Sequence, residues 1–367
     1  MHNLKSDNLR NSNIELLRIL AIIMIIFHHF SFHGGYSINS LSFFSTVWLQ
    51  FIGSCGKISV NLFILISGYF LINSKSVKIN KFLKLIFQIL FYLIVILAFC
   101  LLFKIIPINT FDLKNYLLKY NDWWFARSYL ALYLIHPYVS LFLNSLSKEK
   151  YRNLLIFSFI FLSIIPTITN IKFDDGNLIW FIFIYSLGGY ISKYPIKNDW
   201  TSIKYFIYSL ILLLISFIFV IIYDYNNYGA SDFTLKINDF FRIDKLVVLL
   251  ISLFIFLGFL NLKIKNNKYI NIIASCSFGI YLIHDSIYIR NYIWKNLFFK
   301  PLYFSRLLYL IPYSIVVVLI VFIVCCIIEL IRIYLVEKLY LKSLDKLSIR
   351  IEKGISKFLN WKWFKKI

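Results

Sequence analysis

The chain has 367 residues, of which 60% are hydrophobic and only 15% are charged, so it has too little polar surface to coat a soluble globule. Lysine and arginine outnumber aspartate and glutamate by 39 to 17, which gives a formal net charge of +22. These cations lie between apolar runs of about 20 residues, the length that crosses a bilayer core of about 30 Å. The composition therefore predicts a polytopic membrane protein and argues against nucleic-acid binding.

The chain opens with a polar segment, residues 1–13, which carries Lys5 and Arg10 and is expected in the cytoplasm. The apolar run that follows it ends without the small-residue pattern of a signal-peptide cleavage site. We therefore expect a retained first span.

Ten apolar runs predict an all-α membrane domain of about ten transmembrane helices over residues 14–332. Lysine and arginine concentrate in the turns after the even-numbered runs, which places these turns and both termini in the cytoplasm, because short cytoplasmic loops carry an excess of cations. The runs lie near residues 14–32, 42–72, 82–106, 124–146, 153–169, 178–192, 203–223, 245–262, 269–288 and 308–332.

The second run, residues 42–72, is longer than one perpendicular span, because a helix of this length extends roughly 46 Å. Gly53, Gly56 and Gly68 lie within it. We therefore expect a broken or steeply tilted element, which a membrane tolerates where the backbone is buried in protein or lines a wet cavity.

The last segment, residues 333–367, is rich in cations interleaved with leucine, isoleucine, phenylalanine and tryptophan. This pattern is typical of an amphipathic helix that lies on an anionic membrane surface. A solvated basic tail is the other interpretation.

Ionisable side chains inside the first run form the main candidate site, since such groups are costly at membrane depth and usually face the bundle interior. His29 lies eleven positions after Arg18, just over three helical turns, so both side chains share one face of the helix. Glu15 lies one turn before Arg18. The alternative is an interfacial Glu15–Arg18 ion pair, with the outer histidines meeting headgroups.

A metal site at His29 and His33, four residues apart, is a further possibility. Zinc usually takes three or four ligands, and no carboxylate or thiolate lies near these imidazoles in the sequence. We therefore expect no metal.

The ninth run carries Tyr281, His284 and Asp285. His284 lies as far beyond the start of its run as His29 does in the first, so the two imidazoles are predicted to reach similar depth. A purely structural hydrogen bond between His284 and its acidic neighbour is the alternative.

The fourth run opens with Trp123, Trp124 and Arg127 and continues to Pro137. Tryptophans at this position ordinarily anchor a helix at the membrane interface, but their flat rings also suit the apolar face of a sugar. Pro137 predicts a kink.

Four motifs in chain order resemble those of the acyltransferase 3 family of integral membrane acyltransferases, which includes bacterial enzymes that O-acetylate surface polysaccharides. They are Arg18 followed after ten residues by His29, the segment FILISGY at 63–69, Trp123-Trp124-Phe125 with Tyr133, Leu134 and Pro137, and FGIYLIH at 278–284. The resemblance spans residues 12 to 332. The single ten-helix domain that it implies agrees with the number of apolar runs.

This resemblance implies transfer of an acyl group other than aminoacyl, most often acetyl, to a hydroxyl of a cell-surface or capsular polysaccharide or its lipid-linked precursor. The expected co-substrate is acetyl-CoA or another acyl-CoA, with no bound cofactor. The expected location is the bacterial cytoplasmic membrane. Membrane lipids and glycan-assembly proteins are further expected partners.

The resemblance also implies roles for individual residues. Arg18 and His29 carry over as the residues most tied to activity, with His29 as general base or as covalent acyl carrier. Many members carry an arginine pair after the Ser-Gly-Tyr segment, where this chain has Lys81 and Lys84. Lysine cannot reproduce the bidentate contacts that arginine makes with phosphate. The donor-binding candidates are Glu15, Ser67, Tyr69, Lys81 and Lys84, and the acceptor-binding candidates are Trp123, Trp124, Arg127, Tyr281, His284 and Asp285.

A transporter or flippase of lipid-linked oligosaccharide is the alternative function. Such a protein would show inverted repeats with paired broken helices, whereas the sequence suggests a single broken run. A glycan polymerase would carry a long extracytoplasmic loop, and a purely structural scaffold would not explain the ordered motifs.

Overall fold

The computed structural model describes residues 11–34, 36, 41–105, 123–173, 177–196, 199–227 and 240–359. Every regular element in these ranges is a helix, so the predicted all-α fold is confirmed for this part of the chain. Residues 1–10 of the predicted N-terminal segment and residues 360–367 of the predicted tail lie outside it.

The helices follow the ten predicted apolar runs, each of which contains at least one helix. Three π-helical stretches, named η, interrupt or extend them. The elements are α1 (Ser12–His33), α2 (Phe43–Leu71), α3 (Ile79–Leu102), α5 (Trp124–Ser145), α6 (Lys148–Phe159), η4 (Ile160–Ile164), α7 (Ile165–Thr169), α8 (Leu178–Lys193), α9 (Ser202–Asn227), α11 (Leu246–Asn261), α12 (Lys268–Ser275), α13 (Ser277–His284), α14 (Ile287–Asn291), η5 (Tyr292–Leu297), α15 (Pro301–Ser305), α16 (Leu307–Ile331), η6 (Arg332–Glu337) and α17 (Lys338–Leu359).

Fewer described helices have the length and composition of a membrane span than the sequence has apolar runs. Six described helices are long and apolar enough to cross a membrane, or seven if the bent pair formed by residues 268–284 and 287–297 counts as one span. Two further apolar helices, α8 and α11, have only 16 residues each. The predicted count of ten spans is therefore not confirmed, whereas a multi-pass membrane protein is.

The outer faces of the bundle are apolar, as a lipid environment requires. Large hydrophobic side chains project outward from α3, α9 and α16, among them Leu102, Phe219 and Leu308, which are 78%, 60% and 79% exposed. An aqueous surface would carry polar groups at such positions, so these faces are suited to hydrocarbon.

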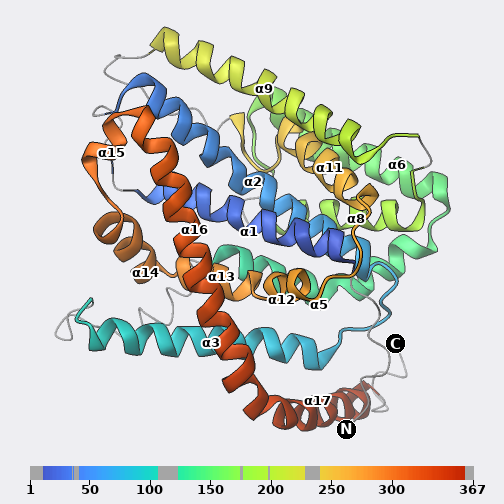
Figure 1. The fold of residues 1–367 in the computed structure, drawn as a ribbon. Coiled ribbons are helices and arrows are strands. Elements are labelled where there is room, and N and C mark those ends of the chain that lie inside the picture. Colours follow the sequence, from blue (N-terminus) through green and yellow to red (C-terminus); the bar gives the residue numbers. More distant parts are fainter. Residues whose placement is uncertain are drawn as a thin grey trace.

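Two helices, α1 and α2, form the centre of the bundle. Figure 1 shows them between α9 and α11 on one side and α3 on the other. The α2 helix packs against α1, α8 and α11. This arrangement buries Glu15 and His29, whereas Arg18 keeps about a third of its side chain exposed.

The expected break in the second run is absent, because α2 is one continuous helix of 29 residues. Its glycines serve close packing instead. A Cβ on Gly68 would lie 2.1 Å from the carbonyl oxygen of Tyr185, and one on Gly188 would lie 2.3 Å from that of Leu65. The two glycines therefore bring the backbones of α2 and α8 into contact, as small residues do between membrane helices.

The strong bend lies in the ninth run instead. The helical segment at residues 268–284 and the one at 287–297 meet at 78°, so the expected continuous helix over 269–288 is wrong. Asp285 and Ser286 form the corner, and Ser286 has the extended backbone of a residue that precedes a helix. Aspartate and serine favour such positions because they compete for backbone hydrogen bonds.

The described part of the last segment forms α17, whose strong amphipathic pattern agrees with the predicted amphipathic helix. It packs against α3, and Asn80 at the start of α3 donates a hydrogen bond to Asp345. The apolar face of α17 is therefore partly covered by the protein itself.

Candidate active site

Two buried histidines meet where α1 and α13 converge. Nδ1 of His29 lies 2.9 Å from Nε2 of His284, and the side chains are 8% and 0% exposed. The prediction that the two imidazoles reach similar depth is confirmed by this contact.

The hydrogen bonds of the pair determine which nitrogens carry protons. Nδ1 of His284 lies 2.6 Å from the carbonyl oxygen of Ile280, and a carbonyl can only accept. His284 therefore holds its proton on Nδ1, so its Nε2 accepts a hydrogen bond from Nδ1–H of His29. In the neutral pair, Nε2 of His29 is left with a free lone pair, which is the requirement for a base.

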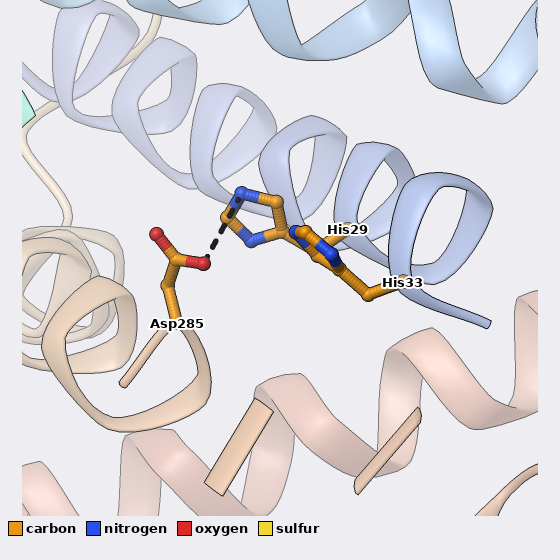
Figure 2. A group of neighbouring side chains, drawn as sticks. All are labelled: His29, His33 and Asp285. Carbon is orange, nitrogen blue, oxygen red and sulfur yellow. Dashed lines mark ion pairs between the residues drawn. The ribbon is translucent and has the colours of Figure 1, made fainter. Parts of the chain in front are cut away.

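A carboxylate faces that lone pair. Oδ1 of Asp285 lies 3.6 Å from Nε2 of His29 and 3.2 Å from Nη1 of Arg290. Figure 2 shows the carboxylate of Asp285, which comes from the bend after α13, directed at the ring of His29 on α1. The carboxylate is placed to stabilise a positive charge that develops on the imidazole.

The sequence suggested that no carboxylate lies near His29 and His33, and the structure shows that one does. His29, His33 and Asp285 each offer a ligand atom, and these atoms lie within 4.8 Å of one another, so a carboxylate does lie near the two imidazoles. Arg290 forms an ion pair with this carboxylate and opposes the binding of a divalent cation beside it. The donor set therefore favours proton transfer over metal binding.

His28, the neighbour of His29, has a packing role. Its Nδ1 hydrogen-bonds with the carbonyl oxygen of Gly53, and its ring fills the space that a Cβ on Gly56 would occupy. These contacts hold α1 against α2 next to the buried pair.

The predicted stripe on α1 lines a cavity. Arg18, Ile22 and Ile25, spaced by one helical turn each, form one wall of a cavity of about 210 Å³, whose other walls include Ser67 and Tyr281. Arg18 is paired with Glu15 at 3.2 Å. The cavity is bordered mainly by apolar side chains and extends from Arg18 toward His29.

A larger, polar cavity of about 580 Å³ adjoins the first, because Ser275 lines both. Lys84 and Lys268 border it, together with a buried network in which Arg332 bonds Glu329 and Glu337 at 2.8 Å each. Lys84 also pairs with Glu337. Cations and carboxylates therefore alternate around this cavity.

Four of the predicted residues lie apart from these cavities. The ring of Tyr69 packs against Phe256, Lys81 and Arg127 are exposed, and Trp123 is buried. None of the four lines the two cavities described above. Trp124 lines neither cavity either and lies beside Phe125. The remaining candidates line one of the cavities, pair with Arg18 or belong to the buried histidine group.

Aromatic rings connect Trp124 with Tyr281, two of the predicted acceptor-binding residues. The ring of Phe125 lies 6.2 Å from that of Trp124 and 5.7 Å from that of Tyr281, measured between centroids. Nζ of Lys57 lies 5.5 Å from the Trp124 ring. The predicted aromatic site is thus joined to a lysine that the sequence analysis did not name.

Three charged residues near the site were not predicted from the sequence: Lys57, Arg290 and Glu329. Lys57 is the only charged residue in the second run and Glu329 is the only carboxylate in the tenth, so the rule that selected Arg18 and His29 selects them too. Arg290 approaches Asp285 only because the chain bends between α13 and α14, and its sequence position carries no such signal.

Taken together, the chain is a multi-pass helical membrane protein that holds a His–His–Asp group within its bundle. A family model described as an acyltransferase domain, that of the acyltransferase 3 family, matches residues 11–329. The chain belongs to this family, and the resemblance seen in its motifs is confirmed. No curated protein and no solved structure matches the chain significantly.

Proposed function

We propose that this membrane acyltransferase is an O-acyltransferase, which transfers an acyl group, most simply acetyl, from acyl-CoA to a hydroxyl of a cell-surface or capsular glycan or its lipid-linked precursor. The observation that carries the proposal is the tautomer of the buried pair. His284 and the carbonyl of Ile280 together leave Nε2 of His29 free to take a proton.

The two adjoining cavities support acyl-CoA as the donor. Coenzyme A combines an anionic nucleotide with a long, largely uncharged arm that ends in the thioester. The polar cavity with Lys84, Lys268 and Arg332 suits the phosphates. The narrower cavity along Arg18, Ile22 and Ile25 suits the arm and leads it toward His29, which lies about 16 Å from Arg18 along the helix.

In the proposed reaction, Nε2 of His29 accepts the proton of the acceptor hydroxyl while the hydroxyl oxygen attacks the thioester carbonyl. The new C–O bond gives a tetrahedral oxyanion, and the hydroxyl of Tyr281, a buried residue that lines the smaller cavity, is the proposed hydrogen-bond donor to it. The C–S bond then breaks, and the leaving thiolate takes the proton from Nε2 of His29. Asp285 stabilises the imidazolium between these steps.

The proposed setting is the bacterial cytoplasmic membrane with both termini in the cytoplasm, so that acyl-CoA reaches the Arg18 end of α1. Glycan-assembly proteins are the expected partners on the acceptor side. A transporter of lipid-linked oligosaccharide is the alternative. It would call for paired broken helices, and the described ranges contain one strongly bent pair.

The test is transfer of radiolabelled acetyl from acetyl-CoA in membranes that contain the protein, with the host's surface glycan as acceptor. We expect label in the glycan from the wild type and none above background from His29→Gln inserted at the same level. Equal label from both proteins would remove His29 from the reaction, and its absence with every acyl-CoA supplied would favour the transporter.

A further inference from the structure

A third cavity, of about 180 Å³, lies away from the two donor cavities and has a basic lining. Lys57 of α2 borders it together with Lys172, Arg242 and the ring of Trp180. Asp244 is the only carboxylate among its lining residues that the structure describes. Three cations therefore face one carboxylate among the described residues around this cavity, and one of the cations, Lys57, comes from the middle of a membrane helix.

Of these cations, Arg242 is fully occupied by the protein. Its Nε and Nη2 donate to the carboxylate of Asp244 at 2.6 Å and 2.9 Å, Nη1 donates to the carbonyl oxygen of Asn170, and Nη2 also donates to that of Ile171. Arg242 and Asp244 therefore neutralise each other and hold the segment around residues 170–171 in place.

The two lysines of the cavity, Lys57 and Lys172, differ from Arg242 in their hydrogen bonding. Neither Lys57 nor Lys172 has a hydrogen bond or ion pair with a residue that the structure describes. Nζ of Lys57 lies 5.5 Å from the centroid of the Trp124 ring, and Lys57 lies close enough to Lys172 for their charges to repel. A half-buried lysine in the middle of a membrane helix is costly without an anion, so the pair points to an anionic ligand.

Lys57 also lies near the catalytic group. It lies close enough to Asp285 for their opposite charges to attract, although the two side chains do not form an ion pair. The residue before it, Gly56, packs directly against the ring of His28, which precedes His29. A ligand held by Lys57 is therefore adjacent to the side of the bundle where Nε2 of His29 is free.

We propose that this cavity, bordered by Lys57, Lys172 and Trp180, binds an acidic group of the acceptor glycan, so that the natural acceptor is an anionic sugar. The group is a carboxylate or a phosphate ester on the sugar, and the rings of Trp124 and Trp180 offer flat apolar faces beside it. Binding the acid at Lys57 presents a hydroxyl of the same or the adjoining sugar to His29. This inference rests on the proposed function.

The phosphates of coenzyme A do not account for this site. They are accommodated at the Arg18 end of α1, where Lys84 and Lys268 border the polar cavity. The lining residues of the basic cavity and those of the two donor cavities have no member in common.

The experiment measures binding without turnover. Full-length protein in lipid nanodiscs is equilibrated with three labelled disaccharides that differ at one carbon, which carries a carboxylate, a phosphate ester or a neutral hydroxymethyl group. We expect at least one acidic disaccharide to bind at least tenfold more tightly than the neutral one. The acid that shows the preference identifies the group on the natural acceptor.

Substitutions of the two cavity lysines test whether the preference for acidic disaccharides arises in this cavity. Lys57→Met is expected to reduce the ratio of acidic to neutral binding to about one, and Lys57→Arg to retain most of it. Lys172→Met, which changes an exposed side chain and leaves the helix core intact, is expected to lower the ratio at least threefold. Lys150→Met, at an exposed position outside the cavity, is the matched control and should keep the ratio of the wild type.

Equal binding of the three disaccharides to the wild type, or a preference that survives both Lys57→Met and Lys172→Met, would overturn the inference. The acetyl-transfer assay separates this result from a failure of the proposed function. Acetyl transfer without an acidic preference contradicts only the basic cavity as an acceptor site. A preference that depends on Lys57 without any acetyl transfer contradicts the acyltransferase reaction.

Discussion

The two ends of α1 handle charge in opposite ways. At the Arg18 end, three of the four cations have a carboxylate partner, since Arg18 pairs with Glu15 and both Lys84 and Arg332 pair with Glu337. The fourth, Lys268, lies over the ring of Tyr269. Near the His29 end, Lys57 and Lys172 have no such partner among the described residues, and Asp285 is shared between His29 and Arg290.

This difference indicates how each end contributes to the reaction. Cations that are already paired add less net attraction for an anion than an unpaired cation does, so at the Arg18 end cavity shape and hydrogen bonds must supplement the attraction of Lys268 for the phosphates. An unpaired cation attracts an anion strongly, and a free imidazole nitrogen is ready to accept a proton. We therefore expect substitutions near His29 to affect the rate and those near Arg18 to affect donor affinity.

The largest effect is expected from His29→Gln, which removes the base and keeps a polar side chain of similar size. The rate of acetyl transfer should fall about 10²- to 10⁴-fold, the range that a positioned general base contributes. His33→Gln is the matched control, one helical turn further along α1, and should change the rate far less. Initial rates of label incorporation in membranes measure both, and an equal loss in the two variants would favour a metal held by His29, His33 and Asp285.

The next effect concerns His284 as a positioning residue, which acts through His29. His284→Phe removes the acceptor that holds Nδ1–H of His29, so kcat should fall roughly 10- to 100-fold, as misplacement of a reacting group typically costs, with little change in KM for acetyl-CoA. His284→Gln restores a hydrogen-bonding side chain and should recover part of the loss. A change in KM alone would contradict the proposed role.

A stability effect of intermediate size is expected at the glycine contact between α2 and α8. In Gly68→Ala the new Cβ would overlap the backbone of Tyr185, so the helices must separate, at a cost of about 1–3 kcal/mol. Gly354→Ala is the control, because nothing lies within 4 Å of its added Cβ. Thermal unfolding in detergent should show a lower midpoint for Gly68→Ala alone, and equal midpoints would refute the close contact.

The smallest effect is expected at the donor end. Lys84→Met removes one cation from the polar cavity while Arg332 remains to pair with Glu337, so KM for acetyl-CoA should rise a few-fold with kcat nearly unchanged. Lys81→Met, at an exposed position outside that cavity, serves for comparison. A fall in kcat with an unaltered KM would place Lys84 in the chemical step instead.

Helical periodicity was enough to predict the part of the site that lies on α1. The eleven-residue spacing predicted that Arg18 and His29 share one face of the helix. Counting residues from the start of each run predicted that His29 and His284 lie at the same depth. Both predictions depend only on the fixed rise and turn of a helix. The cavity along Ile22 and Ile25 lies on that same face.

The rest of the site was not predicted from the sequence, because the positions of its residues depend on contacts between helices. Glycines in the second run suggested a break because glycine is a poor helix former, yet Gly56 and Gly68 are needed where another helix approaches closely. The bend at Asp285 has no glycine or proline to announce it, and the ion pair between Asp285 and Arg290 forms across that bend. Lys57 was recognisable from the sequence as the lone charge of its run.

The central claim is that Nε2 of His29 is the atom that accepts the proton of the acceptor hydroxyl. Solid-state NMR of ring-¹⁵N-histidine protein in lipid tests it directly, with the His29 signals assigned by their loss in His29→Gln. The account predicts a protonated Nδ1 and an unprotonated Nε2 for His29 in the neutral pair. A neutral His29 with its proton on Nε2 would contradict the account.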